Sequence, residues 1–430
     1  MTKKYTKTLL NIALSGCLAS LASFSTVAQA GESAEPIKIS LNNWASQRVL
    51  ANVSGKLLQQ IGYNVEYHQA DTQRQFPQIG SGKLHYQAEV WQGTMEAPFE
   101  RQVSRKRIID AGSHQAITRE EWWYPDYLEE VCPGLPDWKA LNKCADKLST
   151  PETKPLGRYL AGPTDWERPD RERIEALGLN YEVVNVINRQ SLRAKLDQAI
   201  ANKQPILVYN WTPNWTDGKY PGKFVEFPEF HKNCETDAGW GENPQLKHDC
   251  GNPKKGWLKK AVWSEFPEKW SCGFELIKNI NFNNNQISAA AAYAEVDEMS
   301  PEEAANRWMG ENEAVWKQWM PACAGSVKLT EAKAEKTEVA ARTAAAATVD
   351  ASALAKSKNC MACHGIENKI VGPAFKDIAA KYKGNEAAVD TLVAKVKNGG
   401  AGNWGEIPMP PNPGVSDAET ETLVKWILSQ

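Results

Sequence analysis

Strand-like and helix-like hydrophobic patterns alternate along the chain from residue 36 to about residue 325. Residues 44–62, for example, carry apolar side chains at the spacing of an amphipathic helix and end on Gly62, a typical residue after a helix C-terminus. Such alternation predicts an α/β fold with a mainly parallel sheet, and the length suits two such lobes. Strands are predicted at 38–43, 64–70, 86–93, 157–163, 180–186 and 204–211, and helices at 44–62, 72–83, 168–178 and 190–203.

The alternation stops between residues 326 and 350, where the chain is rich in Ala, Lys and Glu and lacks Gly, Pro and aromatic residues. This composition predicts a semi-rigid, partly helical linker. The alternative is a final helix of the preceding domain, but no sustained apolar stripe runs along the segment. We therefore expect a large domain at 31–325 and a small one at 351–430.

The bulk composition limits the classes of function. The chain has 430 residues, 42% of them hydrophobic, and a formal net charge of −2 with both signs mixed along the sequence. A nucleic-acid partner is not expected, because it would require a clustered basic face. The 17 Trp are more than cores of this size need, so some of them are expected to line a site.

Residues 1–30 have the pattern of an export signal: lysines first, then an apolar stretch, then a small-residue cleavage site at Ala28–Ala30. They predict a signal peptide and a periplasmic location. The alternative is a lipoprotein signal in which Cys17 is lipidated. The residues after Cys17 stay apolar, however, where a lipoprotein has a polar tether.

The cysteines agree with an oxidising compartment. Six of them form an even set in the large domain, and many pairings are possible. Order and spacing favour consecutive pairs, while free buried thiols remain the alternative. The expected disulfides are Cys132–Cys144, Cys234–Cys250 and Cys272–Cys323.

The pentapeptide CMACH places Cys360, Cys363 and His364 at the spacing that attaches a c-type haem, with the two thiols bonded to the vinyl groups and the histidine as proximal iron ligand. The alternative is half of a zinc site, which would need two more ligands. No Cys or His follows His364, whereas Met409 is the one Met after Met361. We predict one covalent haem c with Met409 as sixth ligand, hence a one-electron carrier.

The last eighty residues, in particular KNCMACHGIENKIVGPAFKDI and GEIPMPPNPG, resemble the short bacterial class I cytochromes c. The resemblance implies an all-α domain in which helix 419–430 packs on helix 351–360. It also implies that Pro373 packs on the proximal histidine, near a carbonyl that accepts the imidazole N–H. Trp404 would hydrogen-bond a haem propionate, and Asn412 would lie near the methionine sulfur. Ordinary packing and turn formation are the alternatives for these two.

The large domain resembles the substrate-binding proteins of ABC importers for glycine betaine and choline, through LNNWAS, EVWQGTMEAPFE, AGPTDWE and LVYNWTPNW. The resemblance implies a type II periplasmic binding protein whose two lobes close on ligand by hinge motion. Lobe one would comprise about 36–124 and 216–325, and lobe two about 125–215. The implied partner is a permease in the inner membrane.

A quaternary ammonium carries charge but donates no normal hydrogen bond, whereas aromatic ring faces attract it by about 0.5–2 kcal/mol per ring. The motifs of the resemblance imply a cage of tryptophans, with a fourth member contributed by lobe one. Core or interface packing is the alternative for each of them. The cage candidates are Trp44, Trp91, Trp166 and Trp211.

A second ligand contact is expected beside the cage. Glu167 and Arg168 lie at the start of the predicted helix 168–178, and their backbone N–H groups could bind a ligand carboxylate. Ala45 and Ser46 follow Trp44 where some choline binders have an Asp, which favours a betaine-like zwitterion over choline. The side chain of Glu167 argues against a carboxylate unless it points away.

No nucleophile–base arrangement stands out among the scattered His, Ser and Cys residues, so no enzyme is predicted. The leading hypothesis is a periplasmic binding protein for a quaternary-ammonium compound fused to a single-haem electron carrier. One alternative is a redox module that presents an amine to a partner dehydrogenase, because one haem cannot take two electrons. Another is a ligand or redox sensor. The redox partner is not identified by the sequence.

Overall fold

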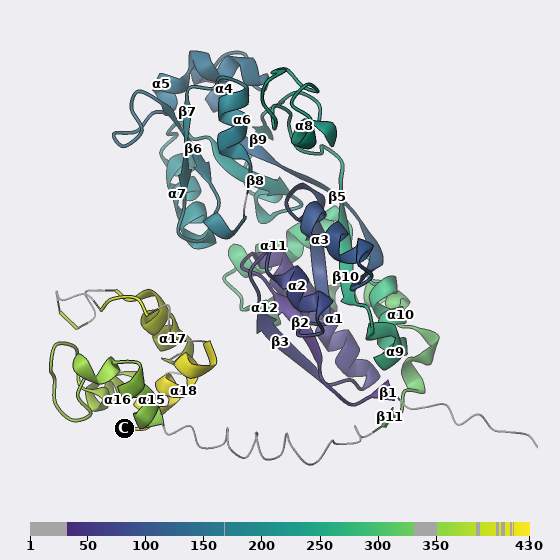
Figure 1. The fold of residues 1–430 in the computed structure, drawn as a ribbon, viewed down its shortest axis with the longest axis vertical. Coiled ribbons are helices and arrows are strands. Elements are labelled where there is room, and N and C mark those ends of the chain that lie inside the picture. The colour runs from purple at the N-terminus through teal and green to yellow at the C-terminus, as the bar shows by residue number, and fades with distance from the viewer. Residues whose placement is uncertain are drawn as a thin grey trace, which may run out of the picture. The chain divides into compact units, whose positions relative to one another are not determined.

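The computed structural model describes residues 32–166, 168–330, 351–383, 388–400, 404–405, 409–412, 415 and 417–430 (Figure 1). These residues form two compact units, one up to residue 330 and one from residue 351, which are described separately. The predicted signal peptide with Cys17, residue Glu167 and linker residues 331–350 lie outside the described residues. Within the described part, no helix has the length and apolar character needed to cross a membrane.

The first lobe is built on a sheet with the strand order β3-β2-β4-β10-β5. Strands β2 (Ile37–Leu41), β3 (Val65–Gln69) and β4 (Tyr86–Trp91) run parallel, while β10 (Gly256–Trp263) runs antiparallel to both β4 and β5 (Ile108–Pro125). The carboxyl ends of β2 and β4 therefore lie at the same edge of the sheet.

The second lobe shares strand β5 with the first. Residues 108–118 of β5 pair with β10, whereas residues 119–125 pair with β8 (Val208–Thr212) and β9 (Gly222–Phe224). Strand β6 (Gly157–Ala161) lies between β8 and β7 (Tyr181–Asn185) and is parallel to both. One long strand thus connects the two lobes (Figure 1).

The strand pairing differs from the predicted lobe boundaries at both crossovers. Strand β5 passes from one sheet to the other near Thr118, and the chain returns only just before β10. Residues 216–252, predicted for lobe one, contain β9 and pack on lobe two: Asn243 Nδ2, for instance, donates to the Ala176 carbonyl over 2.9 Å. Three residues of β9 are too few to produce a periodic hydrophobic pattern. The prediction of a mainly parallel sheet also missed the antiparallel strands β5, β9 and β10.

The predicted elements coincide with observed ones within a few residues. Helix α1 shows why: Val49, Val53 and Leu57 recur on one face and are fully buried, and Gly62 ends the helix with φ of 116°. The longer helices of the first unit are α1 (Ala45–Ile61), α2 (Gln75–Gly80), α3 (Gln92–Ser104), α6 (Asp170–Ala176), α7 (Arg189–Ala201), α10 (Ser271–Asn279), α11 (Asn284–Glu295) and α12 (Pro301–Glu311).

Short helical turns and one small sheet complete the first unit. Strands β1 (Glu32–Ser33) and β11 (Leu329–Thr330) pair in parallel, so the first residues of the predicted linker are part of this unit. The one-turn elements are α4 (Leu128–Val131), η1 (Trp138–Lys143), α5 (Ala145–Leu148), η2 (Thr164–Trp166), η3 (Trp215–Gly218), α8 (Asn233–Thr236), α9 (Phe266–Lys269), α13 (Glu313–Trp316), η4 (Lys317–Trp319) and η5 (Ala322–Gly325).

Three disulfides join the cysteines of the first unit in the predicted consecutive pairs. Their Cα–Cα distances of 5.4, 6.3 and 5.9 Å are normal for disulfides. The third closes a loop of 51 residues and fixes the segment that follows α13 to the start of α10. The pairs are Cys132–Cys144, Cys234–Cys250 and Cys272–Cys323.

The second unit is helical in its described part. The C-terminal helix packs against the other long helices, including the first one as predicted, and Lys358 pairs with Glu419 over 3.0 Å at that contact. Phe375, Val424 and Ile427 are buried between them. The elements are α15 (Ala351–Ser357), η6 (Cys360–Ala362), α16 (Phe375–Tyr382), α17 (Ala388–Asn398) and α18 (Asp417–Leu428).

Candidate ligand and haem sites

Four tryptophans from the two lobes line one cavity. Trp44 follows β2 and Trp91 ends β4 in the first lobe, whereas Trp166 follows β6 and Trp211 lies in β8 of the second. Each tryptophan comes at or just after the carboxyl end of a parallel strand, where ligands of open α/β sheets bind. The space between these side chains that protein atoms do not fill is about 310 Å³, part of it open to solvent. The structure therefore brings together all four predicted cage residues.

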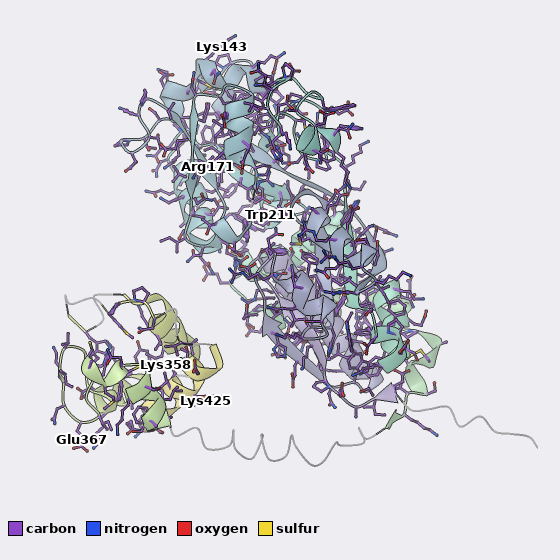
Figure 2. All side chains as sticks on the ribbon, in the orientation of Figure 1. Lys143, Arg171, Trp211, Lys358, Glu367 and Lys425 are labelled. Atoms are coloured by element: carbon purple, nitrogen blue, oxygen red, sulfur yellow. A yellow bond between two sulfur atoms is a disulfide. The ribbon has the colours of Figure 1, made fainter. Side chains whose placement is uncertain are left out.

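The rings of the second lobe meet at steep angles, as the walls of a cage do. The ring centroids of Trp166 and Trp211 are 5.3 Å apart with an interplanar angle of 87°. Tyr209, which the sequence reasoning missed, lies 5.7 Å from Trp166 and lines the same cavity. Figure 2 shows Trp211 at the junction between the two lobes. Thr72, Thr94 and Met95 complete the wall on the side of the first lobe.

A buried carboxyl group, Glu120 on β5, also lines the cavity. Its Oε1 accepts hydrogen bonds from the Tyr209 hydroxyl at 2.8 Å and the Thr94 hydroxyl at 3.0 Å. Its Oε2 lies against the backbone of Gly93, so closely that any larger residue there would collide with it. The Gly93 backbone helps to stabilise the charged form, although no described residue makes a hydrogen bond of normal geometry to Oε2. Burial raises the pKa of Glu120, partly offset by the charge of Arg168. The raised pKa favours the protonated form, in which the carboxyl group carries an O–H donor.

A second buried carboxylate lies behind the cage. Glu89 on β4 is 0% exposed, and its Oε2 accepts from the Trp44 indole at 2.8 Å, the Trp91 indole at 3.0 Å and the Ser46 hydroxyl at 3.1 Å. Burial raises the pKa of Glu89 to about 7, and these three hydrogen bonds partly offset that rise. In the sequence EVW this residue resembled an ordinary strand position, and no motif pointed to it.

The side chain of Arg168 lies beside the cavity without lining it. It is buried, 4.5 Å from the Tyr209 ring and paired with Asp170 at 3.3 Å. Helix α6 begins only at Asp170. Glu167 lies outside the described residues. The predicted carboxylate contact at these two residues therefore stays a prediction.

Polar contacts join the lobes on two sides of the cavity. Asn43 of the first lobe accepts from the Trp166 indole at 2.6 Å and donates to Asp165 at 3.0 Å. On the other side, Arg189 and Arg193 of α7 pair with Glu295 at the end of α11. The two lobes are thus in contact around the tryptophans, in the arrangement expected when such lobes close on a ligand.

In the second unit, one apolar cavity is lined by every residue predicted to hold or adjoin haem. His364 Nδ1 donates to the Pro373 carbonyl over 2.8 Å, which leaves Nε2 as the nitrogen for iron. Gly372 lies against the imidazole so closely that a larger residue would collide with it. The predicted residues lining the cavity are Cys360, Cys363, His364, Pro373, Trp404, Met409 and Asn412.

Met409, which also lines this cavity, is held by two backbone hydrogen bonds of 2.9 Å with Gly400. Asn412 Nδ2 donates to the Pro410 carbonyl at 3.0 Å, and Lys381 lies 4.4 Å from the ring of half-exposed Trp404. The proposed contacts of Trp404 with a propionate and of Asn412 with the methionine sulfur stay predictions.

Comparison with known proteins identifies the first unit. Residues 35–311 match the model for the substrate-binding domain of ABC-type glycine betaine transport systems. The chain belongs to this family. It is 35% identical over 310 residues to the trimethylamine N-oxide-binding protein of Pelagibacter ubique, across 70% of this chain and 96% of that protein. The glycine betaine/L-proline-binding protein of Borrelia burgdorferi has the same fold, with a TM-score of 0.55 at 17% identity over 68% of this chain and 99% of that one.

Residues 348–430 match the cytochrome c family and belong to it. They are 58% identical over 76 residues to cytochrome c-551 of Azotobacter vinelandii, which covers 18% of this chain and 92% of that protein. The substrate-binding protein family and the cytochrome are therefore joined in one chain, as the sequence predicted. The chain carries one covalently bound haem c.

The cavity of the cytochrome unit fits this group. Cys360 and Cys363 are the thiols that would form its thioether bonds, and His364 and Met409 would be its axial ligands. The bound haem supplies one-electron transfer. The chain's own part is to hold the imidazole in one tautomer through Pro373 and to surround the group with apolar side chains.

Proposed function

We propose that the first unit is the periplasmic substrate-binding protein of an ABC importer for a small methylated ammonium compound. The observation that carries this proposal is the cavity between the lobes, walled by Trp44, Trp91, Trp166 and Trp211. Ring faces attract an ammonium group that cannot donate hydrogen bonds. Tryptophans from both lobes close the cavity only when the lobes meet, so ligand binding and closure are coupled.

Among such compounds, the site favours trimethylamine N-oxide over glycine betaine. The carboxyl group that lines the cavity is that of Glu120, and the buried Arg168 lies against the Tyr209 ring. A protonated Glu120 can donate to the single N-oxide oxygen, whereas the carboxylate of glycine betaine would meet a second carboxyl in a cavity that no Lys or Arg side chain lines. The relative from Pelagibacter ubique, named for trimethylamine N-oxide, supports the same choice.

Binding by the cage can be tested with single alanine substitutions followed by fluorescence titration. Trp91→Ala and Trp211→Ala should each weaken trimethylamine N-oxide binding by roughly 2- to 30-fold, which corresponds to the loss of one cation–π contact. Trp240→Ala is the matched control, because this Trp is 47% exposed and does not line the cavity. The proposal is refuted if the wild-type protein binds none of trimethylamine N-oxide, glycine betaine and choline.

A second candidate function follows from the fusion of a ligand site with a one-electron carrier. In this case the binding unit would present its ligand to a partner redox enzyme that exchanges electrons with the haem. An N-oxide is an electron acceptor, and its reduction to the amine takes two electrons and two protons, so a partner must collect electrons from two haems in turn. Ligand-dependent oxidation of the reduced haem, seen only with that partner present, would favour this function.

A further inference from the structure

One carboxylate oxygen holds two of the four cage tryptophans. Glu89 Oε2 accepts both indole N–H groups, from Trp44 at the start of α1 and from Trp91 at the end of β4, and also the hydroxyl of Ser46. The other oxygen, Oε1, is buried and has no hydrogen-bond partner among the described residues. Glu89 therefore contacts the edges of rings whose other surfaces line the cavity.

This arrangement fixes the two rings from different elements in one orientation. Trp91 lies two residues after Glu89, so both side chains leave β4 on the same side of the sheet. Trp44 approaches from the N-terminus of α1, where its own side chain makes no cap hydrogen bond. Without the shared acceptor, both buried indole N–H groups would lose a partner, and a buried unpaired donor is costly.

The charge of Glu89 has no partner within the described part of the chain. No ion pair to a Lys, Arg or His balances it there, and three hydrogen bonds are what stabilise its charged form. A carboxylate that accepts from an indole N–H strengthens that bond and polarises the ring, because linked hydrogen bonds polarise one another. A polarised ring presents a more negative face to a cation.

We propose that Glu89 is a positioning residue that orients Trp44 and Trp91 and makes the cavity prefer a cationic trimethylammonium head over a neutral group of the same shape. This inference rests on the proposed function and deepens it. Glu89 acts only through the two indoles, because it does not itself line the cavity. Its effect differs from that of Glu120, which faces the ligand directly.

The test compares two probes of matched shape, trimethylamine N-oxide and tert-butyl alcohol, in the full holo-chain at pH well above 7. Glu89→Gln keeps an acceptor but removes the charge, and should weaken binding of the N-oxide by roughly 5- to 30-fold while changing that of the alcohol less than about threefold. Glu66→Gln, on the exposed face of β3, is the control. Equal losses for both probes, or none for either, would overturn the inference.

A second measurement keeps the inference testable if the variant folds poorly. In the reduced, diamagnetic wild-type protein, the indole N–H resonances of Trp44 and Trp91, assigned by Phe substitution, should lie downfield of that of exposed Trp240. They should also move upfield in Glu89→Gln. Resonances of Trp44 and Trp91 at the position of Trp240 in the wild type would refute a charged acceptor. Failure of the wild type to bind any methylated ammonium compound would instead refute the proposed function.

Discussion

The carboxyl group of Glu120 makes trimethylamine N-oxide binding depend on pH. Its Oε1 is occupied by Tyr209 and Thr94, so a proton on Oε2 is the donor available to the ligand oxygen. Burial raises the pKa of Glu120, which favours the protonated form in the folded protein. The contribution of Glu120 to the affinity should therefore fall as the pH rises through this raised pKa. A permanently cationic ligand such as choline should show the opposite trend.

Two substitutions separate the hydrogen bond from the titration. Glu120→Leu removes the donor and leaves the ligand oxygen unpaired in the closed cavity, which costs about 1–3 kcal/mol, or roughly 5- to 150-fold in affinity. Glu120→Gln keeps an N–H donor that does not titrate. Its binding should therefore no longer fall as the pH rises, so that the titration of Glu89 near pH 7 is the pH dependence that remains, while Tyr209 and Thr94 retain an acceptor.

The assay is calorimetric titration of the holo-chain with trimethylamine N-oxide between about pH 6 and about pH 9.5, above the ordinary pKa of a glutamate. Above the pKa, each pH unit should cost up to about tenfold in wild-type affinity. The reasoning is refuted if wild-type affinity is the same throughout this range, or if Glu120→Leu binds as tightly as the wild type at the lower limit.

Two further predictions concern the haem ligand and the third disulfide. Met409→Ala should lower the reduction potential by on the order of 0.1 V and change the ligation bands of the visible spectrum, because thioether ligation raises the potential; an unchanged potential and spectrum would remove Met409 from the ligand set. Replacing Cys272 and Cys323 with Ser opens a 51-residue loop and should destabilise the binding unit by about 2–4 kcal/mol. Calorimetric unfolding would measure that change, with the haem spectrum as the unaffected internal control, and an unchanged unfolding temperature would show that this disulfide adds no stability.

Local patterns were enough to predict most elements and the haem pentapeptide. Helix α1 was predictable from its periodic apolar face and from Gly62 at its end. The haem-binding residues Cys360, Cys363 and His364 lie within five consecutive positions of the sequence. The cage tryptophans were also predictable, because each lies in a short motif at a strand end. None of these inferences requires knowledge of which strands pair.

The features that were missed depend on tertiary pairing. Glu120 and Glu89 are strand residues beside tryptophans, and a strand carboxylate normally faces water. Only the assembled sheets show that one lines the cavity and the other is enclosed behind it. Strand β9 was not predicted, because three residues are too few to show a periodic hydrophobic pattern. Without β9, the sequence did not show that residues 216–252 continue along the second lobe. The sequence analysis considered only the backbone N–H of Arg168. In the structure, its buried side chain lies against the Tyr209 ring, and its charge lowers the pKa of Glu120.

The central claim is that the cavity between the lobes binds a methylated ammonium compound of the trimethylamine N-oxide type. Calorimetric titration of the wild-type holo-chain with trimethylamine N-oxide, glycine betaine and choline in turn tests it most directly. The account predicts saturable binding of trimethylamine N-oxide at one site per chain, tighter than that of glycine betaine. Tighter binding of glycine betaine would contradict the assigned role of Glu120, and no binding of any of the three would contradict the cavity's function.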